Sequence, residues 1–183
     1  MPGIGLLNEK PLHASLKAWY ARPGDRFEVP VDGFVIDIVR DDLLLEIQTG
    51  GFASIHAKLA RLVPSHRTRL VHPIAQEKWI VHPTSTRRKS PRRGRVEDLF
   101  WEMVSIPRLA AHRNFSLEVL MIREEEVRRR DDRRGWRRGG WVVAERRLLD
   151  VVDRVVFEKP EDWLALLPPP GGSSRSPRAR SRR

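Results

Sequence analysis

The feature that most constrains the fold is a pair of short apolar runs, FVIDIV at residues 34–39 and LLLEIQT at residues 43–49. Both runs are rich in Leu and β-branched residues, and the segment between them contains the polar pair Asp41 and Asp42. This pattern predicts a β-hairpin. Because nearly every position of both runs is apolar, we expect the hairpin to be covered on both faces.

Three polar residues interrupt this apolar hairpin: Asp37, Glu46 and Gln48. If Asp41 and Asp42 are the two turn residues, Asp37 lies opposite Glu46, and directly opposed residues have Cβ atoms about 4.5–5.5 Å apart. Strand alternation places Glu46 and Gln48 on one face. Two carboxylates so close repel each other, and a hard divalent cation such as Mg²⁺ or Mn²⁺ would relieve that repulsion. The pattern therefore predicts a metal site at Asp37 and Glu46. A three-residue loop in place of the two-residue turn would shift the strand pairing and separate the two carboxylates.

Helical and strand-like segments flank the hairpin. Residues 8–20 are typical of a helix, with Asn8 as its N-cap and an apolar stripe at Leu12, Leu16 and Trp19. The other expected elements are a strand at residues 26–29, a helix at residues 52–62 and strands at residues 68–72 and 78–82. The predicted order is αβββαββ, an α/β core over residues 1–82.

After residue 82 the composition changes. Residues 83–95 are rich in Lys, Arg, Ser, Thr and Pro, which is typical of a basic linker. We expect residues 96–168 to form a small basic α+β domain. Its predicted elements are helices at residues 96–104, 141–157 and 160–167, a strand at residues 115–122 and a charged, wing-like loop at residues 128–140. The Arg-rich tail at residues 169–183 is expected to be disordered.

The formal charge of +11 is concentrated in the second half of the chain and in the tail. Arginine supplies most of the excess, and its planar guanidinium suits phosphate, so the pattern favours a nucleic-acid partner over a merely soluble Arg-rich chain. Trp136 and Trp141 would stack on a base or pack on the neighbouring helix. The Arg residues of 128–138 form one candidate phosphate-binding group, and the linker cations form the other: Arg87, Arg88, Lys89, Arg92, Arg93 and Arg95.

Several classes of protein are excluded. The chain has no cysteine, so it has neither disulfides nor thiolate metal sites. No apolar run approaches the roughly 18 to 20 residues of a membrane span, and the first residues lack a secretory signal pattern. We therefore expect a cytoplasmic protein with no membrane partner. The histidines show neither an HExxH pattern nor a zinc-finger spacing, and His13 and His56 are interpreted as surface or packing residues.

At the hairpin the chain resembles the PD-(D/E)XK nuclease superfamily, the restriction-endonuclease-like fold, in which a helix precedes three antiparallel strands, a further helix and more strands. An acid on the second strand and a (D/E)-x-K triplet on the third build the metal site of that family. Asp37 matches the first acid, EIQ at residues 46–48 occupies the triplet, and Glu9 fits a glutamate that many members carry on the first helix. The resemblance covers residues 8–82. The pattern NEKPLH…EIQT is also similar to that of a family of uncharacterised bacterial proteins.

The resemblance implies Mg²⁺- or Mn²⁺-dependent hydrolysis of phosphodiester bonds, in DNA more than in RNA. Asp37 and Glu46 would hold the metal, Gln48 would place the nucleophilic water, and Glu9 would assist a metal or its water shell. Gln48 replaces the family's lysine, a fixed cation beside the charge that develops on phosphate, although some active members carry the same E-x-Q triplet. Two alternatives stay open, a catalytically inactive DNA-binding or regulatory module of the same fold and an interaction module for other proteins. A homodimer is allowed.

Three further residues compete for roles in this site. Asp32 is a rival for the first acid, but strict alternation places it on the opposite face from Asp37. Lys58, on the helix after the hairpin, would supply the missing cation from another element, a migration known in the superfamily. Lys78 is a weaker candidate of the same kind. For both lysines an ordinary surface position is the favoured interpretation.

Overall fold

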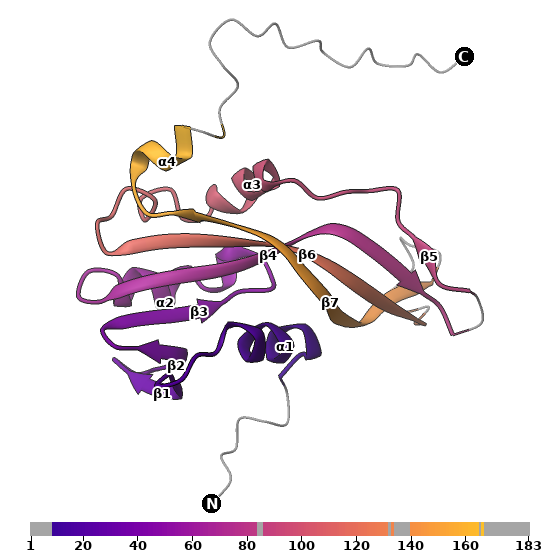
Figure 1. Ribbon diagram of the computed structural model, residues 1–183, viewed down its shortest axis with the longest axis horizontal. Helices are drawn as coiled ribbons and strands as arrows, with labels where there is room; N and C mark the ends of the chain where they lie inside the picture. The colour runs from indigo at the N-terminus through magenta and orange to yellow at the C-terminus, as the bar shows by residue number, and fades with distance from the viewer. Residues whose placement is uncertain (1–8, 84–85, 132, 134–139, 165, 167–183) are drawn as a thin grey trace, which may run out of the picture.

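The computed structural model describes residues 9–83, 86–131, 133, 140–164 and 166, and within these ranges the chain forms one mixed sheet of seven strands. Neighbouring strands follow the order β1-β2-β3-β4-β6-β7, and β5 pairs with β4 outside this path (Figure 1). The strands are β1 (Arg26–Val31), β2 (Phe34–Arg40), β3 (Leu43–Ile47), β4 (Arg67–Val81), β5 (Arg88–Lys89), β6 (Phe115–Arg130) and β7 (Trp141–Phe157). This confirms a mixed α/β fold.

The strand directions divide the sheet into two parts. β1, β2 and β3 are antiparallel, β4 then runs parallel to β3, and β6 runs parallel to β4. β7 returns antiparallel to β6, and β5 is antiparallel to β4. Parallel neighbours need crossover connections, and here both crossovers carry a helix onto the same face of the sheet.

Helices cover both faces of this sheet. They are α1 (Pro11–Tyr20), α2 (His56–Leu62), α3 (Leu99–Met103) and α4 (Pro160–Leu164), with the 3₁₀ turns η1 (Phe52–Ser54) before α2 and η2 (Val96–Asp98) before α3. Leu70 packs in a cluster with Phe52 and Leu59, whereas its neighbour Val71 packs in a second cluster with Leu12 of α1. Because successive strand residues face opposite sides, this alternation places α1 on one face and α2 and α3 on the other (Figure 1).

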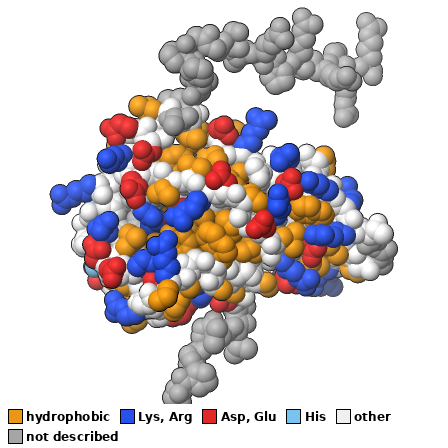
Figure 2. Space-filling view, in the orientation of Figure 1, with side chains coloured by type: hydrophobic (Ala, Val, Ile, Leu, Met, Phe, Trp, Pro, Cys, Tyr) orange, Lys and Arg blue, Asp and Glu red, His pale blue; other side chains and the backbone are white. Residues whose placement is uncertain are grey.

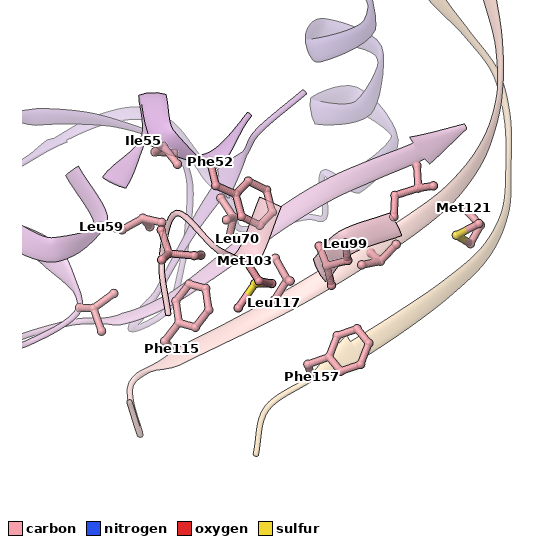
Figure 3. Close-up of a cluster of buried hydrophobic side chains, with 14 residues drawn as sticks. Phe52, Ile55, Leu59, Leu70, Leu99, Met103, Phe115, Leu117, Met121 and Phe157 are labelled. Carbon is pink, nitrogen blue, oxygen red and sulfur yellow. The ribbon is translucent and has the colours of Figure 1, made fainter. Parts of the chain in front are cut away.

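The larger cluster combines residues from both halves of the chain. Figure 3 shows Phe52 and Leu59 beside Phe115 and Leu117, and Phe157 closes the same cluster from β7. The segment predicted as a linker is also attached to the sheet, because β5 pairs with β4 and the Gly94 main-chain N–H donates to Ala75 O at 2.9 Å. The segments predicted as a first domain (residues 1–82), a linker and a second domain (residues 96–168) therefore contribute strands to one sheet, and the two predicted domains share one core.

The predicted hairpin has the expected turn. Arg40 pairs with Leu43 and Ile38 with Leu45, so Asp41 and Asp42 are the two turn residues, and Asp41 adopts φ 51°. The prediction of a two-residue turn is confirmed. Asp32 lies in the turn between β1 and β2, where its carboxylate is 3.0 Å from His66 Nε2, so it does not enter the predicted site.

The two strands predicted at residues 68–72 and 78–82 are one continuous strand, β4, so that prediction was wrong. Pro73 suggested a break because it has no N–H for a ladder. In the structure the pairing of β4 with β3 stops at Val71, two residues before Pro73. Among the described residues, no strand on the β3 side of β4 therefore needs a hydrogen bond from position 73. A register shift between Ala75 and Glu77 accommodates the remaining irregularity.

The helix predicted at residues 141–157 is also wrong, because this segment is strand β7. Its apolar pairs, such as Leu148-Leu149 and Val151-Val152, recur with a spacing close to that of a helix. The pairing of β6 with β7 contains register shifts at Met121/Ile122, Arg123/Glu124 and Val127/Arg128. Each bulge resets the inward and outward alternation, so a bulged strand imitates helical periodicity.

The remaining predictions have mixed outcomes. The helices at residues 8–20, 52–62, 96–104 and 160–167 are present with shorter bounds, and the strand at residues 115–122 continues to Arg130. Residues 128–130, predicted as part of a loop, belong to β6. Asn8, most of the loop at residues 131–139, Trp136 and the tail at residues 169–183 lie outside the described residues. No described helix has the length and apolar character that a bilayer span requires.

Candidate functional site

Asp37 lies where β2 and β3 separate. The ladder between these strands stops at Ile38 and Leu45. Beyond it, the Asp37 carboxylate takes the place of a backbone acceptor, because its Oδ2 accepts a hydrogen bond of 2.8 Å from the Ile47 main-chain N–H. The same oxygen is 3.1 Å from His13 Nε2 of α1. Burial raises the pKa of Asp37, but the hydrogen bonds from His13 and Ile47 outweigh it and hold the pKa below its usual value.

Glu46 of β3 is almost fully buried, with 4% of its side chain exposed, and its charge partner is Lys58 of α2 at 2.5 Å from Oε1. Lys58 Nζ also donates to Val35 O at 2.6 Å. Burial, followed by the negative charge of Asp37, raises the pKa of Glu46 to about 7 despite the lysine. Glu46 is therefore a carboxyl group whose ionised form is short of positive charge.

His13 of α1 and Glu9, which lies two residues before the start of α1, extend the site. His13 Nδ1 is 2.5 Å from Glu9 Oε1, and Lys17 Nζ is 2.6 Å from the same oxygen. Since both partners of His13 are carboxylates, both ring nitrogens donate, which is the protonated form. The hydrogen bond to Asp37, opposed by burial, raises the pKa of His13. Burial raises the pKa of Glu9, but hydrogen bonds from Lys17 and His13 bring it below its usual value.

Gln48 is placed differently from the prediction. Its Nε2 donates to Gly51 O at 2.8 Å and to Ser54 Oγ at 2.7 Å, so the amide holds the loop that follows β3. The cation beside Glu46 is instead Lys58, which reaches the site from the next helix. The structure thus brings Glu9, Asp37 and Glu46 together with two basic residues, His13 and Lys58, and directs Gln48 elsewhere.

Sequence reasoning assigned both of these basic residues to ordinary positions. For His13 a signal was present, because Glu9, His13 and Lys17 recur every four residues, a spacing that places side chains on one side of a predicted helix. The interpretation of His13 as a surface or packing residue is wrong, since it bridges two carboxylates. For Lys58 the sequence contains no such signal, because the pairing depends on how α2 crosses the sheet. His56 is exposed, as expected for a surface residue.

The carboxylates can be tested for their fit to a divalent cation. Glu46 Oε1 is buried without a hydrogen bond of good geometry, and the charge of Asp37 acts on it. Mg²⁺ is commonly bound by one or two carboxylates, with waters and substrate phosphates completing its shell. Among the described residues no group of three His, Cys, Asp or Glu side chains is arranged to hold a metal by itself. The residues present therefore fit a water-rich Mg²⁺ or Mn²⁺ site with two protein carboxylates, Asp37 and Glu46.

The predicted phosphate contacts of the linker divide into two sets. Three of them face acids of the sheet: Arg87 lies 2.9 Å from Glu125, and Lys89 and Arg93 lie 2.9 and 3.4 Å from Glu77. In the part of the chain that the structure describes, the other three side chains form no ion pair, and all three are exposed: Arg88, Arg92 and Arg95. Exposed Arg side chains without acidic partners are the ones that can reach a phosphate.

Comparison with known proteins gives a family. Residues 10–158 match the family model described as "Domain of unknown function (DUF8091)". An uncharacterized protein of Treponema pallidum (strain Nichols) is 32% identical over 155 residues, which cover 81% of this chain and 61% of the relative. The chain thus spans less than two thirds of that relative's length. No solved structure is significantly similar. The chain belongs to the DUF8091 family.

Proposed function

We propose that this member of the DUF8091 family is a metal-dependent nuclease of the PD-(D/E)XK type, which hydrolyses phosphodiester bonds of nucleic acid, DNA more than RNA, in the cytoplasm. The observation that carries the proposal is the convergence of Asp37, Glu46 and Lys58 from β2, β3 and α2. Two acids on neighbouring strands and a lysine beside them are the side chains that the PD-(D/E)XK superfamily uses. The lysine here comes from the helix rather than from the triplet.

The bound cation would polarise the scissile phosphate and lower the pKa of its water. The chain's own residues do the rest. Lys58 has three N–H donors, of which two face Glu46 and Val35 O, so the third is free for a phosphate oxygen. There the ammonium would stabilise the negative charge that develops in the transition state. His13 orients Asp37 through Nε2, and Glu9 orients His13 through Nδ1.

A second candidate is a nucleic-acid-binding module that no longer cleaves. The observation in its favour is that each carboxylate already has a basic partner, His13 for Asp37 and Lys58 for Glu46. Such pairs can satisfy the acids without a metal, as structural ion pairs do. The alternative differs from the first proposal in cleavage and in metal binding, so one assay separates them.

The test is a cleavage assay on single-stranded and duplex DNA and on RNA, with Mg²⁺ or Mn²⁺ and with a chelator. We expect metal-dependent cleavage that Asp37→Asn reduces by more than about 100-fold, since the metal and its ligands supply several kcal/mol of stabilisation. Lys58→Met should reduce the rate by about 100- to 1,000-fold, as does the loss of one fixed donor to a transition-state oxyanion.

The matched control is Asp42→Asn, because Asp42 lies in the exposed turn of the same hairpin. Its activity should equal that of the wild type. Cleavage that survives Asp37→Asn would assign the activity to another site or to a contaminant, and binding without cleavage under any metal would favour the second candidate.

A further inference from the structure

A cavity of about 580 Å³ lies next to the candidate site, between β4, β6, β7 and α3. Two contacts join it to the chain that follows Glu46. His72 Nδ1 lies 2.7 Å from Gln48 O, and Arg146 Nη1 donates to Thr49 O at 3.0 Å. Both His72 and Arg146 line the cavity. A ligand in this cavity would therefore lie beside the end of β3, on the far side of the loop that Gln48 holds.

The cavity wall is built in two layers of opposite charge. Glu124 is fully buried and lies 3.0 Å from Lys78 and 2.6 Å from Arg146. Glu126, 5% exposed, lies 2.9 Å from Lys78 and 2.6 Å from Arg128. The three cations are 26–30% exposed at their side chains. Buried acids beneath partly exposed cations hold those cations in fixed positions while leaving donors free for a ligand.

The two other acids in the wall are engaged by main-chain donors. Asp98 Oδ2 accepts from the Arg95 N–H at 3.1 Å, and Glu102 Oε2 accepts from the Phe52 N–H at 3.0 Å. Arg92 also lines the cavity, is exposed, and has no side-chain partner among the residues described. Arg92 and the Nη groups of Arg128 are thus the wall's available guanidinium donors.

Trp101 of α3 completes the wall and is 79% exposed. The face of the molecule drawn in Figure 2 carries many Lys and Arg side chains over the end of the sheet where β5 lies, with acidic side chains among them. An exposed indole beside guanidinium groups is the combination that proteins use to bind unpaired nucleotides, since the base stacks on the ring and the phosphate meets the cation.

We propose that this cavity binds one or more unpaired nucleotides of a single strand, with a base against Trp101 and phosphates against Arg92 and Arg128. This inference deepens the proposed function, on which its link to cleavage rests, by assigning the substrate a single-stranded segment. A duplex does not fit the proposal, because the faces of paired bases are covered by their neighbours in the stack. The cavity volume lies within the range of about 300–1,000 Å³ typical of small-ligand sites.

Binding is measured by fluorescence anisotropy of labelled DNA and RNA single strands of about 16 nucleotides, the upper range of site sizes for such grooves, and of the matching duplex. The full chain is used with a chelator, so that nothing is cleaved. We expect the single strand to bind more tightly than the duplex. Trp101→Ala should weaken single-strand binding by about 5- to 150-fold, which is the cost of losing one stacked base.

Arg92→Ala should weaken binding and lower the slope of log affinity against log salt by about 0.7, as expected for one lost phosphate contact to a single strand. The matched controls are Trp19→Ala on α1, where the tryptophan is 45% exposed, and Arg113→Ala, an exposed arginine just before the start of β6. Both should bind like the wild type. All four side chains are at the surface, so circular dichroism should show unchanged folding.

Equal binding of single strand and duplex, or unchanged binding in Trp101→Ala, would overturn the inference. So would no binding of the single strand at low salt. The proposed nuclease activity is judged separately by Asp37→Asn. Binding that depends on Trp101, without cleavage, would support the nucleotide-binding cavity and refute the nuclease proposal. Metal-dependent cleavage of duplex DNA that is unchanged in Trp101→Ala would support the nuclease proposal and refute the nucleotide-binding cavity.

Discussion

Two buried glutamates, Glu46 and Glu124, face lysines in this protein, and their surroundings differ. Glu46 has one cationic contact, Lys58, and a second acid beside it, Asp37. Glu124 lies between two cations, Lys78 and Arg146. Glu46 thus has a single cationic contact and a neighbouring carboxylate, whereas Glu124 has two cationic contacts.

This difference teaches what each region can bind. Two carboxylates that lie close together in a buried place attract a cation, because an added positive charge lowers the energy of both ionised groups. Cations held from below by buried acids offer their remaining donors to an anion. The proposed nuclease would need both kinds of environment, one for a metal and one for the phosphates of a substrate, and the two lie at opposite sides of the loop after β3.

The largest expected effect on stability comes from removing Glu124, the buried acid with two cationic partners. Glu124→Ala leaves Arg146 without its acidic partner and Lys78 with Glu126 alone, so we expect a loss of about 3–5 kcal/mol in the free energy of unfolding. Urea denaturation followed by circular dichroism measures it. The matched control is Glu125→Ala, whose side chain is 16% exposed and pairs with the surface residues Arg87 and Arg147. If both variants lose the same stability, Glu124 does not organise the cavity wall.

The comparison also explains what could be predicted from the sequence. The hairpin and its turn were predictable because the polar pair Asp41 and Asp42 separates two apolar runs, and register follows from turn length. The acids Asp37 and Glu46 were predictable for the same reason, since a charge inside an apolar strand needs an explanation. These features depend on residues close together in the chain.

The partners of those acids were not predictable in this way. Lys58 meets Glu46 only because α2 crosses the sheet at a particular place, and Glu124 meets Arg146 only because the segment at residues 141–157 is a strand. The bulges in the pairing of β6 with β7 give the apolar residues of that strand a helix-like spacing in the sequence. Contacts between distant segments follow from packing of the whole sheet, which local periodicity does not contain.

A smaller effect concerns pH and sharpens the first half of the comparison. The pKa of Glu46 is raised from 4.5 to about 7 in the folded protein, so the folded state binds a proton that the unfolded state has released. Stability is therefore lost as pH rises through this window, by about 3 kcal/mol. In metal-free buffer, Glu46→Gln should gain about that much relative to the wild type between pH 4.5 and pH 8.

Chemical denaturation across this pH range measures the gain. Asp37→Asn should reduce the fall seen in the wild type, because the charge of Asp37 is the second cause of the raised pKa after burial. Parallel stability curves for the wild type and Glu46→Gln would show that Lys58 fully compensates Glu46, and the contrast with Glu124 would disappear.

The smallest effect tests the metal directly. Mn²⁺ or Mg²⁺ that binds only the folded protein should stabilise it by about 2.7 kcal/mol when the free metal is 100 times its dissociation constant. A thermal shift at pH 8, where Glu46 is ionised, measures this. The shift should vanish in Asp37→Asn and persist in Asp42→Asn, whose carboxylate lies in the exposed turn. The thermal shift should also be smaller at pH 5, because a proton on Glu46 and a protonated His13 on Asp37 compete with the metal for the carboxylate oxygens of those two acids. A shift that is independent of both pH and Asp37 would place metal binding outside this pair, and the acid-rich environment of Glu46 would then be a structural feature of the fold.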